Sequence, residues 1–145
     1  MFKRFRITFF TFVLGFFLSF SAVALAASAS SPLSSFGTIY NHAYWGDATV
    51  FTDSGHAAGS AGIECGNSAP AGYMGARAYL YRQSVGSYVS LSEWSYNSLT
   101  ATSWGTSTDW YSGYSDYYRA RGNFNIYNGY DYTEKFSGYT PYLHN

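Results

Sequence analysis

Residues 117–127, Tyr-Tyr-Arg-Ala-Arg-Gly-Asn-Phe-Asn-Ile-Tyr, decide the fold class of this 145-residue chain. The even-numbered positions from 118 to 126 carry apolar or small side chains, and the odd-numbered positions carry Tyr, Arg and Asn. A period of two residues predicts a β-strand with one buried face. A slip of one residue would bury Arg119 and Arg121, so the orientation of this strand is strongly specified.

Asn128-Gly129 follows this stretch directly, and residues 130–136 alternate again. Asn and Gly readily adopt the positive φ angles that a type I′ turn requires at both central positions. The pair therefore predicts a tight hairpin that returns the chain as a second antiparallel strand.

Further strands are predicted over residues 75–82 and 88–96, with weaker ones over 37–45 and 48–52. A stretch rich in Gly, Ala and Ser, residues 53–72, is predicted to be a long surface loop. No segment after residue 26 shows a helical period of 3.6 residues. The sequence thus predicts an all-β protein, a small antiparallel β-sandwich or barrel of about six or seven strands.

The N-terminus has the order of features that is typical of a cleaved signal peptide, residues 1–26. Three basic residues between positions 3 and 6 precede an apolar run over 7–20, and Ala24-Leu25-Ala26 suits a cleavage site. The alternative is an uncleaved membrane anchor, although a span needs roughly 20 apolar residues. We expect a secreted, extracellular protein with no stable membrane span after cleavage. Its predicted parts are a flexible lead-in over 27–35 and a single β domain over 36–145.

Composition restricts the partners of the exported part. Removing residues 1–26 leaves five basic and eight acidic residues, a formal charge of −3. Nucleic acid and anionic lipid surfaces both select a strongly basic patch, so the sequence argues against both partners. Cys65 is the only cysteine, so an internal disulfide is impossible. No cofactor motif is present, and we expect none.

Aromatic residues give the strongest functional signal. All 16 tyrosines and all four tryptophans follow residue 26. The best candidates for contact lie among Ser, Thr, Gly and Asp in a loop-like context: Trp104, Trp110, Tyr111 and Tyr114. Rigid rings beside small hydrogen-bonding residues suit contact with sugars or protein surfaces. The alternative is that the rings fill a core that is short of Leu, Ile and Val, and Trp94 is assigned to such a core.

Three arrangements could carry chemistry, but none has a specific spacing. The first is the thiol of Cys65 with Asp53 and His56, which could form a nucleophile, base and orienting group. The second is a metal site made by His42, Asp47, Asp53 and His56. The third is a pair of glycosidase carboxylates among several acids. Those acids are Glu93, Asp109, Asp116, Asp131 and Glu134.

Several segments resemble a group of small secreted, aromatic-rich proteins of Gram-positive bacteria. They are residues 71–78, Trp94-Ser95-Tyr96-Asn97, residues 117–122, Tyr127-Asn128-Gly129 and Thr140-Pro141-Tyr142. In size and in Tyr, Trp and Gly richness the chain is also similar to lactococcin-type bacteriocins. The resemblance implies secretion and a β fold, and no catalytic residue comes with it.

The preferred function from sequence is that of a secreted, non-catalytic binding protein. Its Tyr/Trp-rich loops would contact cell-envelope glycan or a protein surface. A bacteriocin-like antagonistic protein and a small secreted hydrolase are the alternatives.

Overall fold

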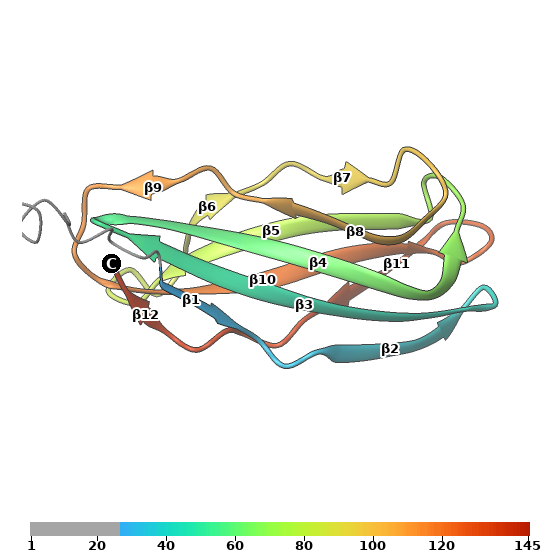
Figure 1. Ribbon diagram of the computed structural model, residues 1–145, viewed down its shortest axis with the longest axis horizontal. Helices are drawn as coiled ribbons and strands as arrows, with labels where there is room; N and C mark the ends of the chain where they lie inside the picture. Colours follow the sequence, from blue (N-terminus) through green and yellow to red (C-terminus); the bar gives the residue numbers. More distant parts are fainter. Residues whose placement is uncertain (1–26) are drawn as a thin grey trace, which may run out of the picture.

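The computed structural model describes residues 27–145, which form a β-sandwich of two packed antiparallel sheets with six strands each (Figure 1). The predicted all-β sandwich is confirmed. The predicted signal peptide, residues 1–26, lies outside the described residues. No helix of residues 27–145 is long and apolar enough to cross a membrane.

Each sheet has two long central strands with two short strands along each edge. The first sheet contains β1 (Ala27–Ser30), β2 (Ser34–Ile39), β3 (His42–Asp53), β4 (His56–Ala69), β8 (Ala101–Ser107) and β9 (Tyr111–Ser112). The second contains β5 (Met74–Arg82), β6 (Tyr88–Leu91), β7 (Ser95–Tyr96), β10 (Tyr117–Tyr127), β11 (Tyr132–Phe136) and β12 (Leu143–His144). β3 pairs with β4 at the centre of the first sheet, and β5 with β10 at the centre of the second.

The broken edges explain why the structure has twelve strands where the sequence predicts six or seven. In the first sheet, β1 and β2 both pair with β3, and β8 and β9 both pair with β4. In the second sheet, β6 and β7 both pair with β5, and β11 and β12 both pair with β10. The strand predicted over 88–96 is one of these edges, divided into β6 and β7. Short edge strands also limit edge-to-edge aggregation.

A buried Ser or Thr bonds to the central strand at each break, and Asn97 does the same where the chain leaves β7. The backbone N–H of this residue donates to a carbonyl of the central strand, and its side-chain oxygen accepts the N–H of that same central residue. The six pairs are Ser31 with Ala48, Thr108 with Gly59, Ser92 with Ala78, Asn97 with Met74, Ser137 with Gly122 and Thr140 with Ala120. The central strands therefore stay hydrogen-bonded where the edge backbone turns away.

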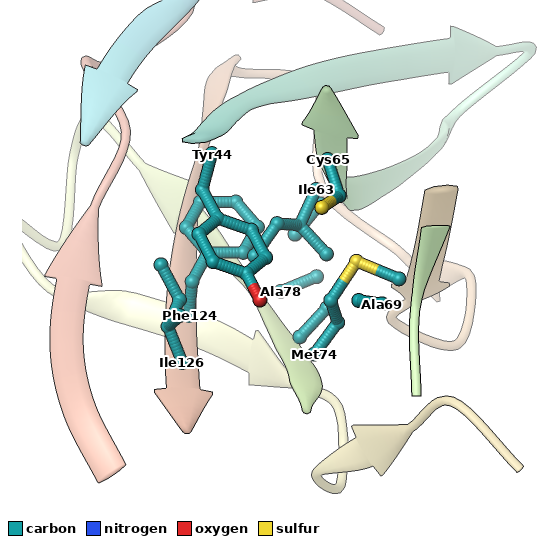
Figure 2. Packing of buried hydrophobic residues seen from close by; sticks show 10 residues of the cluster. Tyr44, Ile63, Cys65, Ala69, Met74, Ala78, Phe124 and Ile126 are labelled. Atoms are coloured by element: carbon teal, nitrogen blue, oxygen red, sulfur yellow. The ribbon is translucent and has the colours of Figure 1, made fainter. Parts of the chain in front are cut away.

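The core lies between the two sheets, and the inward face of β10 is the one that the sequence predicts. Tyr118, Ala120, Phe124 and Ile126 have no exposed surface. Figure 2 shows the larger of two core clusters, in which side chains from β3, β4, β5 and β10 meet. Alternation along 117–127 thus fixed both the strand and its orientation.

The loop predicted over residues 53–72 is wrong, because most of that stretch is β4, a 14-residue central strand. Its inward positions carry Ala57, Gly59, Ala61, Ile63 and Cys65, which face the opposite sheet. Small residues are poor strand formers in isolation, but strand preference depends on packing against neighbours. At this central position small side chains let the two sheets approach, and at Gly59 a Cβ would lie 3.1 Å from Ala120.

Two N-terminal predictions also differ from the structure. The sequence predicts a flexible lead-in over 27–35, but β1 and the start of β2 lie there and pair with β3. It predicts a single strand over 37–45, but the chain reverses inside this range. Tyr40 and Asn41 adopt φ angles of 47° and 67° between β2 and β3. Positive φ is uncommon for a tyrosine, so Asn41 alone gives a weak turn signal for this hairpin.

The hairpin predicted at Asn128-Gly129 is confirmed in position but not in turn type. Tyr127 pairs with Tyr132, so the loop has four residues rather than two. Gly129 has a φ of 97°, whereas Asn128 does not have a positive φ. The Asn128 side-chain oxygen instead accepts the backbone N–H groups of Tyr130 and Asp131. This Asx-type capping replaces the type I′ geometry.

Candidate binding face

The outer face of the second sheet gathers arginine and aromatic side chains. Because Ala78, Leu80, Ala120 and Gly122 face the core, their neighbours along β5 and β10 face outward. We name this surface the Tyr/Arg face. It consists of Arg77, Tyr79, Tyr81, Tyr88, Trp94, Arg119, Arg121, Phe136, Tyr139 and Tyr142.

Strand register sets the arginines of the Tyr/Arg face in successive rows. Arg119 lies opposite Tyr81, Arg121 opposite Tyr79, and Arg77 opposite Asn123. Rows on one face of a strand are about 7 Å apart, so the three cations span about 14 Å along the sheet. The arginines therefore form an extended row along the sheet rather than a single cluster.

Aromatic rings cover the guanidinium groups. Arg119 lies 3.8 Å from the ring centre of Tyr139 and 4.9 Å from that of Tyr142. Arg121 lies 4.5 Å from the ring centre of Phe136 and 4.9 Å from that of Tyr139. Tyr139 therefore stands against both cations. Each such contact contributes about 0.5–1 kcal/mol at an exposed site and fixes the plane of the guanidinium.

The serines that hold the edge breaks also anchor two of these arginines. The Nε–H of Arg77 donates to the carbonyl oxygen of Ser92 over 3.1 Å, and the Nε–H of Arg121 donates to that of Ser137 over 3.2 Å. The Nε–H of Arg119 is buried and has no acceptor. Stacking and anchoring thus leave the terminal nitrogens of Arg77 and Arg121 as the groups that can meet a partner.

No carboxylate of residues 27–145 forms an ion pair with the three arginines of this face. The one ion pair of that range joins Arg82 to Asp116 at 2.8 Å. Glu134, on neighbouring β11, accepts a hydrogen bond from the side-chain nitrogen of Asn123 at 2.7 Å. The positive charge of the Tyr/Arg face is therefore not neutralised by ion pairs within the described chain.

Several rings of this face are open to solvent. Tyr88 is 52% exposed, and Phe136, Tyr139 and Tyr142 are each about two-fifths exposed. Burial, followed by a hydrogen bond with Tyr139, raises the pKa of Tyr81 to about 12. The Tyr81 hydroxyl therefore stays protonated near neutral pH and can both donate and accept hydrogen bonds.

Two tryptophans have the opposite placement to the one predicted. Trp104, expected in a loop, lies on β8 opposite Ile63, packs against the core and donates its indole N–H to the Ser95 hydroxyl at 3.0 Å. Trp94, assigned to the core from sequence, is partly exposed and lies 5.8 Å from Arg77. Trp104 points inward because the pairing of β8 with β4 places it on the same inward face as Ile63.

The other three predicted contact residues lie at one end of the sandwich. Trp110 is 54% exposed. Tyr111 is in β9 and packs against the smaller core cluster. Tyr114 is 52% exposed, and its ring lies 4.0 Å from the Arg82 guanidinium. The structure brings Tyr111 and Tyr114 together, with ring centres 6.2 Å apart, but does not place Trp104 with them in one contact surface.

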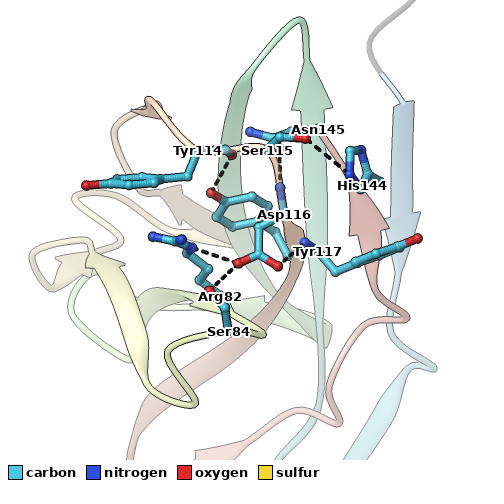
Figure 3. Close-up of polar contacts among 9 residues, drawn as sticks. Arg82, Ser84, Tyr114, Ser115, Asp116, Tyr117, His144 and Asn145 are labelled. Carbon is cyan, nitrogen blue, oxygen red and sulfur yellow. Dashed lines mark hydrogen bonds and ion pairs between the residues drawn. The ribbon is translucent and has the colours of Figure 1, made fainter.

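Arg82 and Tyr114 belong to a polar cluster that ties the β5–β6 turn to the start of β10 (Figure 3). Asp116 accepts hydrogen bonds from Ser84, from Arg82 and from the backbone N–H of Tyr117. These bonds, with that from Ser84 first, hold the pKa of Asp116 well below its usual range. Tyr114 thus covers a structural ion pair, and this is its clearest role.

A polar groove of about 360 Å³ lies beside Trp94. It is lined by Leu91, Ser92, Glu93, Trp94, Ser95, Thr106, Ser107 and Asp109. Five acids are candidates for glycosidase carboxylates from the sequence. Of these, only Glu93 and Asp109 line the groove. The groove extends the Tyr/Arg face across the edge where the two sheets meet.

The other two sequence hypotheses are not assembled by the fold. Cys65 is nine residues along β4 from His56, or about 30 Å, so Asp53 and His56 cannot serve the thiol. Its sulfur, in a side chain only 6% exposed, lies 3.6 Å from Nδ1 of His42. His42 and Asp53 stand at opposite ends of β3. Residues 27–145 contain no group of three or more His, Cys, Asp or Glu placed to hold a metal ion.

Sequence patterns contained a signal for the Tyr/Arg face. The outward positions of 75–82 and 117–127 are rich in Arg and Tyr, but these strands must pair to join them, and their paired residues are 36 to 52 positions apart in the sequence. Comparison with protein-family models, with curated proteins and with solved structures found no match to this chain, so the resemblance to small secreted Gram-positive proteins stays a prediction.

Proposed function

We propose that this chain is a secreted, non-catalytic binding protein whose Tyr/Arg face takes a glycan chain of the cell envelope. The observation that carries the proposal is the set of partly exposed rings beside β10: Phe136 at the end of β11, and Tyr139 and Tyr142 in the segment between β11 and β12. The secretion part rests on the signal-peptide features of residues 1–26.

The chemistry of the rings favours sugars. Tyrosine combines an apolar ring face with a polar hydroxyl, and a sugar ring likewise combines apolar C–H faces with hydroxyls at its rim. Rigid aromatic side chains lose little conformational entropy when they meet a partner. Small ligands prefer concave, mostly apolar pockets, whereas the Tyr/Arg face lies on the outer side of a sheet, which favours a polymer.

The experiment is a pull-down of the purified mature protein on peptidoglycan, chitin and cellulose. Tyr139→Ala with Tyr142→Ala removes two exposed rings of the face. Tyr130→Ala is the matched control, because Tyr130 is 96% exposed and lies in the β10–β11 loop outside the face. We expect the double variant to bind at least about tenfold more weakly, at roughly 1 kcal/mol per ring, and the control to bind normally.

Failure to bind peptidoglycan, chitin, cellulose and an acidic polymer such as polygalacturonate would refute the proposal, as would an equal loss in Tyr130→Ala. Turnover of a glycan by the wild-type protein would instead favour the hydrolase alternative. Growth inhibition of bacteria by the purified protein would favour the bacteriocin-like alternative.

A further inference from the structure

We propose that the glycan is acidic, and that carboxylates carried on its sugar rings pair with Arg77, Arg119 and Arg121. This inference rests on the proposed function and names the class of polymer that the Tyr/Arg face selects. It comes from the charges of the face rather than from its rings.

Partly buried cations without a counter-ion are costly. Arg119 is stacked against Tyr139 and Tyr142, and its Nε–H is out of water without an acceptor. Buried polar groups normally have partners, so the partly buried Arg119 carries a desolvation cost that a nearby anion would offset. No described carboxylate pairs with Arg77, Arg119 or Arg121, so an anion that pairs with them would come from outside residues 27–145.

The arginines are arranged for a planar anion. The Nε atoms of Arg77 and Arg121 are already bonded to Ser92 and Ser137, and rings fix the guanidinium planes. The terminal pair of nitrogens on each arginine therefore remains for a carboxylate, which the guanidinium fork binds with two parallel hydrogen bonds. The basic residues of this face are all arginine, and Lys135 is on edge strand β11.

Aromatic rings and arginines alternate along the Tyr/Arg face. A matching sugar residue therefore has both an apolar face and a carboxylate. Tyr139 contacts both Arg119 and Arg121, which lie in neighbouring rows. One sugar residue could therefore stack on the ring and pair its carboxylate with an adjacent arginine. A sugar acid in a polymer supplies both features in each residue. Nucleic acid fits less well, because it selects a strongly basic surface, whereas residues 27–145 carry five basic and eight acidic residues.

The test measures binding of oligogalacturonates and of the same oligosaccharides after reduction of their carboxyl groups. We expect the acidic form to bind at least about tenfold more tightly and to weaken with added salt, as ion pairing requires. Arg119→Gln and Arg121→Gln should each reduce the difference in affinity between the acidic and the reduced oligosaccharides. Arg121→Lys should restore this difference only in part, because lysine cannot make the two parallel hydrogen bonds of a guanidinium group. Lys135→Gln is the control that keeps the difference, and thermal melts verify that each variant is folded.

The outcomes separate the two proposals. Equal binding of acidic and reduced oligosaccharides, lost in the Tyr139 and Tyr142 double variant, would overturn the inference and leave the proposed function intact. Absence of binding to any glycan, acidic or neutral, would overturn both. Tighter binding to oligothymidylate, or self-association in sedimentation at the same protein concentration, would show that the arginines serve nucleic acid or a second copy instead.

Discussion

Asn97 holds the point where the chain leaves the second sheet, and its removal should be among the most destabilising single changes. The side chain is 1% exposed. Its oxygen accepts the backbone N–H of Met74 at 2.9 Å, and its nitrogen donates to the carbonyl oxygens of Pro70 and Leu99 at 2.8 and 2.9 Å. Asn97→Ala therefore deletes these three hydrogen bonds, together with a longer one of 3.5 Å to the carbonyl oxygen of Ala69.

The three bonds differ in what their loss costs. Met74 is fully buried, so its N–H would lose its partner without gaining water, at about 1–3 kcal/mol. The Pro70 and Leu99 carbonyls belong to exposed residues, so water can replace the lost Asn97 donor. The loss of each of these two hydrogen bonds therefore costs about 0.5–1.5 kcal/mol. We expect Asn97→Ala to lower the free energy of unfolding by about 3–5 kcal/mol.

Urea denaturation followed by tryptophan fluorescence measures this loss. With a slope of about 1.5 kcal/mol per molar urea, the midpoint should fall by about 2–3 M. Ser98→Ala, at the exposed neighbouring position, should change stability by less than about 0.5 kcal/mol. A midpoint in Asn97→Ala within about 0.3 M of wild type would refute the idea that side-chain hydrogen bonds hold the edge breaks.

Two further predictions concern the remaining sequence hypotheses. Trp104→Ala should lower the melting temperature because the Trp104 ring packs against the core. Trp110→Ala should melt like the wild-type protein because Trp110 is exposed. Equal melting temperatures for the two variants would contradict the different placement of these rings. Burial, and then the charge of Glu64, raises the pKa of Asp47. Its ionised form therefore costs folding stability, and this cost grows as pH rises above the usual carboxyl range. Asp47→Asn should be more stable than wild type at about pH 7 but not at about pH 3, and a gain of equal size at both pH values would contradict this.

The candidate binding face shows how much local pattern can and cannot predict. Alternation along 117–127 placed Arg119 and Arg121 outward, and alternation along 75–82 did the same for Arg77. No local pattern indicated that these strands pair, nor that Tyr139 returns beside β10 to cover both arginines. Trp104 and Trp110 look alike in sequence, yet the pairing of β8 with β4 turns only Trp104 inward.

Local pattern was enough to predict the all-β class, β10 with its buried face, and the hairpin position after Tyr127, because these depend on a two-residue period and a local turn signal. The remaining features depend on contacts between distant parts of the chain. β4 is a central strand although its residues are mostly small, because the opposite sheet packs closely against them. Edge strands break where the Ser, Thr or Asn side chains can bond to a neighbouring strand, and that neighbour is distant in sequence. Contacts between distant residues therefore set both the strand count and the Tyr/Arg face.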